Sequence, residues 1–437
     1  MVSHRNQVLQ GLTGRGVLPA AGPIFAAGSC RNKPAPGRDD PGRQAATALD
    51  APAIGPRGLG WSSAGFAVLL LGAAGPPPGK SFPAYPSSMT NIELNPAEIV
   101  CTGTALGGVG GRPENAGLEV LEPREVPLGG PRAMTVRRTL PQKSRSLIGP
   151  WCFADHYGPQ DVAVSGGMAV PPHPHTGLQT ASWLFTGEIE HRDSVGSHAM
   201  VRPGELNLMT AGRGIAHSEV STPGTSVLHG VQLWIALPDA DRFTPPAFEH
   251  VIPPTATDTG IAVRVFLGSW LGTTSPATAF SPILGAELTV QPGFSAELPL
   301  EIDFEHGLLV DSGDATVCEV PVPAASMGYL PPGTTTLQIS AGPDAPVRAL
   351  LLGGLPLGER IVMWWNFIGR THEEIVEFRR QWMTGIGMTG IGMAEIDAPG
   401  AKSDFSQGEK LFGPVAGYPG RPLPAPEMPG LRLKPRP

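Results

Sequence analysis

The chain has 437 residues, which is enough for two domains with a sizeable core. Its 58 Gly and 50 Pro make it rich in turns and argue against a helical protein, so we expect an all-β fold. The four cysteines have neither CxxC nor zinc-finger spacing, so the sequence suggests no disulfide framework and no thiolate metal site. They are Cys30, Cys101, Cys152 and Cys318. We therefore expect a reducing, cytoplasmic compartment.

Residues 1–88 differ in composition from the rest of the chain. They hold 12 Pro and 14 Gly, and eight Lys or Arg against three Asp give them a charge of +5. Because the whole chain carries −7, residues 89–437 carry −12. A segment of this composition buries too little apolar surface to offset the entropy lost on ordering. We expect residues 1–88 to be disordered and residues 89–116 to be a linker.

Two interpretations of the extension stay open. Met89 could be the true start, which would make residues 1–88 an over-long gene prediction. Alternatively, the extension is a basic, flexible tail that binds an acidic partner. The apolar run at residues 64–74 is shorter than the ~20 residues of a membrane helix. It also lies too far from the amino terminus for a secretory signal, so we expect no membrane segment.

A first antiparallel β-barrel is expected over residues 117–250. Pro203 and Gly204 occupy the second and third positions of a turn, which suits type II because Gly takes positive φ without strain. Gly187 is a second expected turn. The expected strands, in chain order, are residues 134–140, 180–185, 188–192, 206–210 and 230–237.

Two pairs of metal-ligand residue types lie in this barrel. His173 and His175 are two residues apart, and so are His217 and Glu219. On an extended strand, side chains two apart point to the same face, so each pair can aim both groups at one point. Imidazole and carboxylate ligands without thiolate suit Fe, Mn, Ni, Cu or Zn. We predict a mononuclear metal site.

A second barrel is expected over residues 251–395. Leu330-Pro-Pro-Gly333 echoes Arg202-Pro-Gly204, which suggests two related barrels. Residues 251–354 of this unit have one histidine, His306, beside Glu305 and no His-x-His pair, so we expect a packed or surface residue and no metal in this barrel. The expected strands are residues 261–266, 286–290, 307–310, 315–320 and 347–352.

A short helix is expected at residues 372–382, within the second unit. Thr371 and Glu374 have capping-box spacing, and Ile375, Phe378 and Trp382 share one helix face. The segment 383–387 is repeated at 388–392, which we interpret as a tandem duplication in a flexible connection. Residues 396–437 are expected to form an extended tail along the barrels.

Other histidines receive structural interpretations. His156 either hydrogen-bonds a turn or orients a metal ligand. His191 and Asp193 are expected on the surface of an outward hairpin. No partner in the sequence is evident for His198, His229 and His250.

Several motifs together resemble one family. Pro-His-Pro-His-Thr-Gly at 172–177, residues 184–194, Arg-Pro-Gly-Glu at 202–205 and residues 209–219 occur in order and resemble the amino-terminal cupin domain of the pirin family. Asp155-His-Tyr-Gly-Pro-Gln-Asp161 resembles the segment that precedes it. The resemblance implies a bicupin, with two tandem jelly-roll-like barrels and metal in the first.

The resemblance also implies function. Some pirins are described as opening the flavonol quercetin with O2, so we expect an Fe(II)-dependent dioxygenase of the quercetin 2,3-dioxygenase type; Mn, Ni, Co, Cu or Zn could occupy the same ligands. In this view Glu219, as ligand or released base, takes the proton of the substrate hydroxyl. The alternative is a metal- or redox-dependent regulator that binds a transcription factor or metabolic enzyme without turnover. The charge of −12 argues against direct nucleic-acid contact, so such regulation would act through a protein.

Overall fold

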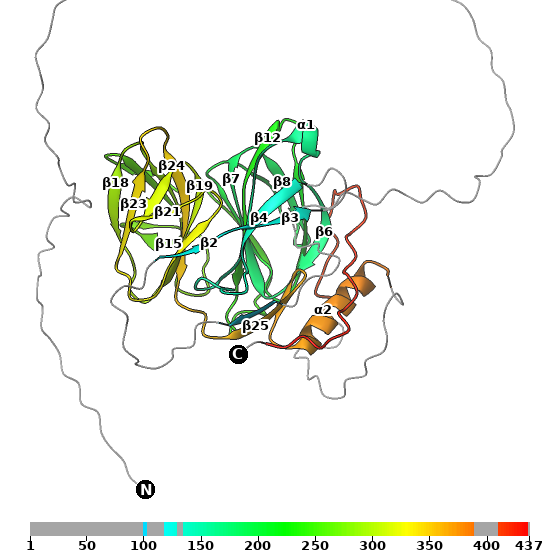
Figure 1. The fold of residues 1–437 in the computed structure, drawn as a ribbon. Helices are drawn as coiled ribbons and strands as arrows, with labels where there is room; N and C mark the ends of the chain where they lie inside the picture. The colour runs from blue at the N-terminus through cyan, green and yellow to red at the C-terminus, as the bar shows by residue number, and fades with distance from the viewer. Residues whose placement is uncertain (1–98, 103–117, 129–133, 389–409, 436–437) are drawn as a thin grey trace, which may run out of the picture. The chain divides into compact units, whose positions relative to one another are not determined.

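A computed structural model describes residues 99–102, 118–128, 134–388 and 410–435 (Figure 1). The expected disorder of residues 1–88 and nearly all of the second repeat copy at 388–392 lie outside these residues. The described part of the chain is mostly β-strand, as predicted. None of its helices is long and apolar enough to cross a membrane.

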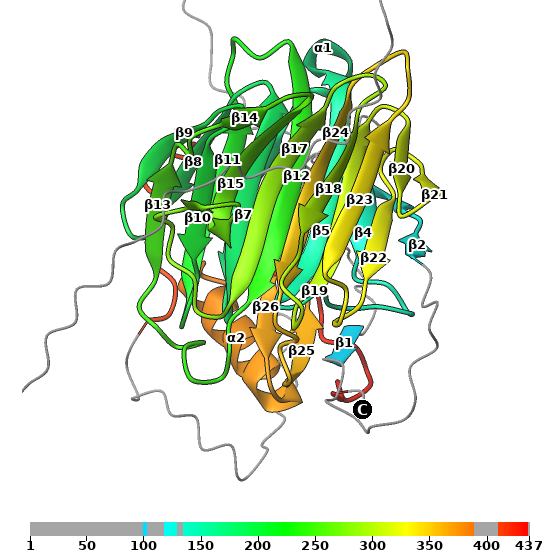
Figure 2. The ribbon, with the colours of Figure 1, turned by 90° about the vertical axis from the view of Figure 1, so that its left-hand side faces the viewer.

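Two sheets built from residues 124–251 form a unit that we call the first barrel. One sheet is made of β3 (Arg124–Leu128), β4 (Met134–Leu140), β5 (Trp151–Asp161), β7 (Leu178–Thr186), β10 (Leu206–Thr210), β12 (Val227–Ala236) and β13 (Ala247–Val251). Its order is β13-β10-β7-β12-β5-β4-β3, and Figure 2 shows β10, β7, β12, β5 and β4 in this sequence. The other sheet has the order β6-β11-β8-β9. It is made of β6 (Ala169–His175), β8 (Ile189–Asp193), β9 (His198–Val201) and β11 (Ile215–Ser221).

The turns of this barrel follow the glycines. Gly204 has a φ of 74°, and the amide of Glu205 donates to the carbonyl of Arg202 at 3.1 Å, which fits the predicted type II turn. Gly187 has a φ of 94° and separates β7 from β8. One helical turn, α1 (Val162–Ser165), follows β5 and is capped by Asp161.

Two further sheets, built from β2 and from residues 256–354, form a unit that we call the second barrel. The larger has the order β14-β15-β17-β24-β19-β22-β2, with β16 beside β15, and the smaller has the order β18-β23-β20-β21. The strands of the larger sheet are β2 (Glu119–Leu121), β14 (Ala256–Asp258), β15 (Ile261–Trp270), β16 (Thr273–Thr274), β17 (Ile283–Val290), β19 (Glu305–Ser312), β22 (Met327–Leu330) and β24 (Val347–Gly354). Those of the smaller are β18 (Ser295–Pro299), β20 (Ala315–Val317), β21 (Val320–Val322) and β23 (Thr336–Ala341).

The single strand expected at residues 315–320 is two strands. β20 and β21 form a hairpin whose turn residues, Cys318 and Glu319, both have positive φ, 45° and 66°. A two-residue turn of this kind usually contains Asn or Gly. The Cys-Glu dipeptide therefore gave no turn signal in the sequence.

Alternation along β7 explains how the two barrels meet. Ala181 and Trp183 lie in an apolar cluster with residues of the second barrel, and the Trp183 ring stacks on Phe266 with centroids 4.7 Å apart. Ser182, between them, points to the opposite face, where it contacts Glu219. One face of β7 thus packs against the second barrel, and the other face lines the interior of the first.

The chain returns to the first barrel after the second. β25 (Arg360–Trp364) pairs with β1 (Ile99–Thr102) and β26 (Phe367–Gly369). Phe367 forms a bridge with Thr176, and the amide of Ile368 donates to the Thr176 carbonyl at 3.0 Å. This hairpin therefore lies against the end of β6.

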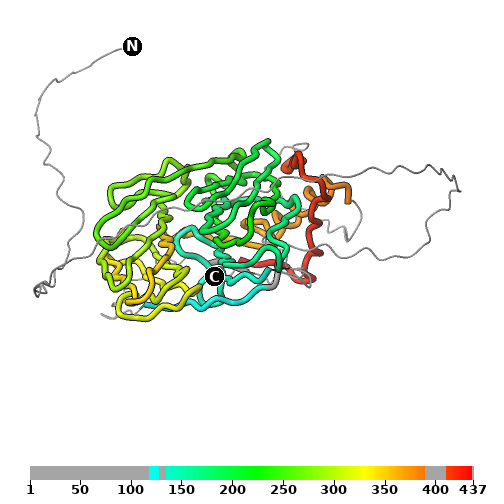
Figure 3. The backbone as a smooth tube through the Cα atoms, turned by 90° about the horizontal axis from the view of Figure 1, so that it is seen from above, coloured from blue at the N-terminus to red at the C-terminus, as the bar shows by residue number. Residues whose placement is uncertain are grey.

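Helix α2 (His372–Gly385) follows the hairpin. The Thr371 hydroxyl accepts from the Glu374 amide at 3.2 Å, and Ile375, Phe378 and Trp382 are buried, as expected from their spacing. The helix continues three residues beyond the predicted end because Met383 is buried too and extends the apolar face. The described tail, red in Figure 3, has no helix or strand and contacts β6 through Leu423, whose amide donates to the Pro172 carbonyl.

Candidate metal centre

The two predicted ligand pairs lie on neighbouring strands. β6 carries His173 and His175, and β11 carries His217 and Glu219, with His217 directly opposite His173 in the antiparallel ladder. The register then shifts, so that Glu219 lies opposite Val170. Because residues two apart on a strand share a face, both histidines of β6 point to the same side.

Three imidazoles meet at one point inside the first barrel. Nε2 of His175 lies 3.1 Å from Nε2 of His173 and 3.1 Å from Nε2 of His217. All three side chains are buried. This group has the residue types and the spacing of a metal-binding set.

Proton counting shows why these nitrogens fit a cation. Nδ1 of His173 lies 2.9 Å from the Pro171 carbonyl, so it carries the ring proton and leaves Nε2 as a bare lone pair. Nε2 of His175 faces two other nitrogens, and one N–H can serve only one of them. A divalent cation accepts a lone pair from all three rings at once, so the donor set fits a first-row metal ion.

Burial keeps these rings neutral. It lowers the pKa of His173 to about 3, although the hydrogen bond to Pro171 works in the opposite direction. Burial, together with repulsion from the neighbouring imidazoles, also holds the pKa of His175 and of His217 well below the ordinary value. Neutral imidazole is the form that binds metal, so the site needs no proton loss from these rings near pH 7.

Glu219 lies beside the three histidines without being part of their close group. Its carboxylate and one nitrogen each of His217 and His191 lie within 4.8 Å of one another. Oε1 of Glu219 accepts from the Ser182 hydroxyl at 3.2 Å. Burial raises the pKa of Glu219, against the opposing effects of His191 and Ser182. The structure thus brings together three of the four predicted ligands and places the fourth next to His217.

The expectation that His191 and Asp193 lie on the surface is wrong. Both are buried, because β8 pairs with β11 and turns Ile189, His191 and Asp193 toward the barrel interior. The alternation of these residues with Glu190 and Arg192 was the available signal. Burial works to raise the pKa of Asp193, but hydrogen bonds from His191 and Ser197 outweigh it and hold that pKa below its ordinary value.

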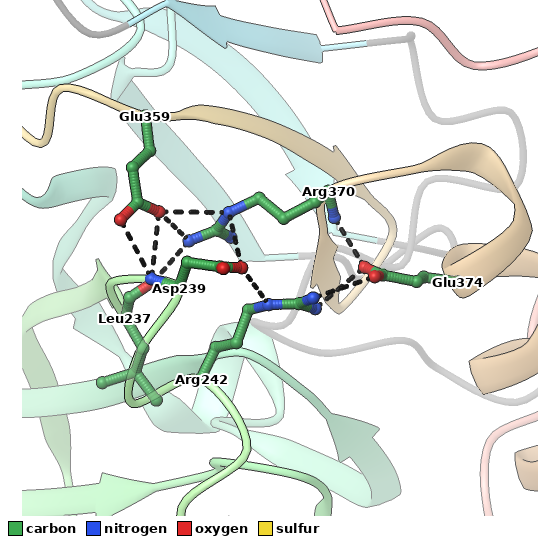
Figure 4. A network of polar contacts seen from close by, with 6 residues as sticks. All are labelled: Leu237, Asp239, Arg242, Glu359, Arg370 and Glu374. Carbon is green, nitrogen blue, oxygen red and sulfur yellow. Dashed lines mark hydrogen bonds and ion pairs between the residues drawn. The ribbon is translucent and has the colours of Figure 1, made fainter. Parts of the chain in front are cut away.

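Ion pairs hold the C-terminal hairpin and α2 against the first barrel. Arg370 donates to the Leu237 carbonyl at 2.8 Å and pairs with the carboxylate of Glu359 (Figure 4). Arg242 meets both carboxylate oxygens of Glu374 at 2.9 Å. We call this set of contacts the clasp. It fastens the hairpin whose Phe367 bridges to Thr176, the residue that follows His175.

A second buried histidine cluster lies where the barrels meet. His156 and His229 of the first barrel both direct Nε2 at Oδ1 of Asp311 in the second, at 2.7 and 2.6 Å. Arg348 reaches Oδ2 of Asp311 and also lies 3.4 Å from Nδ1 of His229. The partner of His229 is thus far away in sequence, which is why the sequence did not reveal it.

The side chains of this second cluster form a hydrogen-bond network around Asp311. The Arg348 group next to Nδ1 of His229 is a donor, so that nitrogen is bare and Nε2 carries the proton. Two N–H groups and a guanidinium then satisfy both oxygens of Asp311. We call these four residues the barrel latch.

Three further histidines lie outside both clusters. His306 is buried, and neither ring nitrogen has a hydrogen-bond partner, so it is a packed residue. His198 is exposed and pairs with Glu190. His250 contacts Asn207 at 2.6 Å.

Two tandem β-barrels with a buried histidine cluster in the first define a bicupin. The family model described as Pirin matches residues 133–235, and that described as Pirin C-terminal cupin domain matches residues 285–387. A Pseudomonas aeruginosa protein named "Putative quercetin 2,3-dioxygenase" is 40% identical over 298 residues, covering 68% of this chain and 90% of that protein. A pirin-like protein of Caulobacter vibrioides is 35% identical over 262 residues, covering 57% and 88%.

A solved structure agrees with these relatives. The crystal structure of quercetin 2,3-dioxygenase from Acinetobacter baumannii matches with a TM-score of 0.64 and 34% identity, over 72% of this chain and 98% of that one. The chain therefore belongs to the pirin family.

Proposed function

We propose that the first barrel binds one divalent metal ion through His173, His175, His217 and Glu219. The observation that carries the proposal is the meeting of three buried imidazoles, in which Nε2 of His175 lies 3.1 Å from Nε2 of His173 and of His217. Glu219 would complete the set, since its carboxylate already lies next to His217. Four such ligands leave one or two coordination positions open for exogenous oxygen ligands.

We propose Fe(II) as the metal. Non-haem iron sites use histidine and carboxylate ligands and keep positions open for O2. Mn, Ni, Co, Cu and Zn accept the same ligands, so the choice among them depends on geometry and availability.

The proposed reaction is O2-dependent ring opening of a flavonol-like aromatic substrate. The names of the Pseudomonas and Acinetobacter proteins support this substrate class. The iron would supply the open positions at which O2 and a substrate oxygen bind. The protein's own contribution is Glu219, which would take the proton of the substrate hydroxyl.

Two features suit Glu219 to that role. Burial raises its pKa, which makes the carboxylate a stronger base than an exposed Glu. Ser182 holds one of its oxygens, and Ser182 also lies 2.9 Å from Oε1 of Gln232. The base is thus held by Ser182 of β7, in the sheet that contacts the second barrel.

The test is anaerobic reconstitution with Fe(II), followed by measurement of O2 uptake on addition of quercetin. We expect uptake with one equivalent of O2 per quercetin, and its loss in His173→Ala and in Glu219→Gln. Metal binding without O2 uptake would contradict the dioxygenase and favour the regulatory alternative. Failure to bind any divalent metal would contradict both.

A further inference from the structure

We propose that His191, held by Asp193, is a positioning residue that directs Nε2 of His217 toward the metal. This inference rests on the metal site proposed above. It concerns residues that are buried beside the ligands but lie outside the proposed ligand set.

The carboxylate of Asp193, which contacts His191, is held by backbone hydrogen bonds. Oδ1 of Asp193 accepts from the backbone amides of Val195, at 3.0 Å, and Ser197, at 2.8 Å. Its other oxygen, Oδ2, lies 3.2 Å from Nε2 of His191. Two backbone donors hold Oδ1, and this orientation leaves Oδ2 facing the His191 ring.

The proton positions follow from the carboxylate. Oδ2 is an acceptor, so Nε2 of His191 carries the ring proton and Nδ1 is a bare lone pair. Nδ1 of His191 lies 3.4 Å from Nδ1 of His217, which must therefore be the donor. A proton on Nδ1 of His217 leaves its Nε2 bare, and this is the nitrogen that meets His173 and His175.

Packing holds the His191 ring in this orientation. The ring is stacked on Phe248, with centroids 4.5 Å apart, and is buried. The two nitrogens of neutral His191 are both used, one by Asp193 and one by His217. No lone pair is left for a metal, which makes His191 an orienting group and not a fifth ligand.

Three substitutions test the proton order. His191→Leu removes the acceptor for His217. His191→Asn keeps one, because an Asn oxygen can take the place of Nδ1. Asp193→Asn is nearly isosteric, but the backbone amides hold its oxygen in place of Oδ1, so its NH2 group faces His191. Nε2 of His191 must then accept, so His191 carries its proton on Nδ1. Nδ1 of His217 becomes the acceptor of that N–H, and the His217 proton moves to Nε2, the metal-binding nitrogen.

The measurement is the affinity for Co(II), by competition with a chelator, together with the absorption spectrum of the Co(II)-loaded protein. We expect His191→Leu and Asp193→Asn to bind roughly 10- to 100-fold more weakly than the unchanged protein. We expect His191→Asn to stay within about threefold, with an unchanged spectrum. His198→Asn, an exposed position on the adjoining strand β9, is the control and should bind like the unchanged protein.

The thermal midpoint of each metal-free variant is compared with that of the unchanged protein. A variant that binds metal weakly but unfolds at the same temperature has lost the positioning of His217 and not its fold. Equal affinity of folded Asp193→Asn and unchanged protein would overturn the proposal. So would a loss in His191→Asn as large as in His173→Ala with an altered spectrum, since that result would make His191 a ligand. If the unchanged protein bound no Co(II), the metal site itself would fail.

Discussion

The hydroxyl of Ser182 lies 3.2 Å from Oε1 of Glu219, inside the first barrel. Ser182 has one proton and also faces the side-chain amide of Gln232 at 2.9 Å. The atom of Gln232 that faces Ser182 is Oε1, so Glu219 and Gln232 are both acceptors for the one hydroxyl proton. Ser182 thus links Gln232 of β12 to the proposed base.

Removing this hydroxyl should slow the reaction without removing the metal. In Ser182→Ala, Glu219 loses a hydrogen bond to a charged group, which is worth about 1.5–3 kcal/mol. We expect kcat for quercetin-dependent O2 uptake to fall roughly tenfold or more, with metal content unchanged. Ser295→Ala, on an exposed position of β18, is the control. An unchanged kcat would show that Ser182 does not position the base.

The clasp should contribute to stability. Arg370→Ala removes the hydrogen bond to the Leu237 carbonyl and the ion pair with Glu359. We expect the free energy of unfolding in urea to fall by about 1–3 kcal/mol, since the freed acceptors are partly buried. Arg380→Ala, which breaks an exposed pair with Glu377, should change it by less than about 0.5 kcal/mol. Equal effects in the two variants would contradict this account of the clasp.

A glycine pair tests the contact between the hairpin and the ligand strand. Gly177 has a φ of 70°, and a Cβ there would lie 2.4 Å from the Ile368 carbonyl oxygen. Gly196 has a φ of 96° with nothing within 4 Å of such a Cβ. Both Ala variants are destabilised by backbone strain of about 1 kcal/mol or more. Only in Gly177→Ala does the new Cβ also clash with the β25–β26 hairpin, at Ile368. We expect its thermal midpoint to fall clearly further, and equal midpoints would refute the close contact.

The barrel latch should make stability depend on pH. Burial lowers the pKa of His156, although its hydrogen bond to Asp311 works the other way. The unfolded chain therefore takes up a proton at this position near pH 6.5, where the folded protein does not, so acidification below about 6.5 favours unfolding. Burial works to raise the pKa of Asp311, but the hydrogen bonds from His156 and His229 outweigh it and lower it, so its contribution is lost only below about pH 4.

His156→Gln isolates this effect, because Gln keeps an N–H donor for Asp311 but takes up no proton. Between pH 6.5 and 4 we expect its free energy of unfolding to fall less steeply than that of the unchanged protein, by up to about 1.4 kcal/mol per pH unit. The measurement is urea unfolding across this range with chelator present, since His173, His175 and His217 titrate in both proteins alike. If the free energies of unfolding of the two proteins fell in parallel with pH, His156 would not be buried in its neutral form.

Local patterns in the sequence predicted much of the fold and most of the site. Residues 134–140 and 206–210 are the strands β4 and β10 with the expected limits. The spacing of two residues predicted that His173 and His175 share a face, because strand geometry fixes which side chains do so. The position of His217 opposite His173 depends on the pairing of β6 with β11. The N-cap residue of α2, Thr371, was likewise visible in the sequence. The Glu374 carboxylate accepts from the Arg370 amide and not from that of Thr371, so the expected capping box is only half formed.

The features that the sequence did not reveal depend on distant residues. His229 finds Asp311 only because β12 and β19 meet between the barrels. His191 is buried because β8 pairs with β11, a contact that the hairpin sequence alone does not specify. The return of Phe367 to β6 joins positions 191 residues apart. Each needs the assembled barrels, whereas the ligand pairs need only one strand each.

We propose that three imidazoles of the first barrel share one divalent ion. The decisive experiment is elemental analysis of protein purified without chelators, with His173→Ala and Glu219→Gln beside the exposed control His198→Ala. We expect about one equivalent of first-row metal in the unchanged protein and in the control, and loss of most of it in the two ligand variants. Stoichiometric metal retained in both ligand variants would contradict the account.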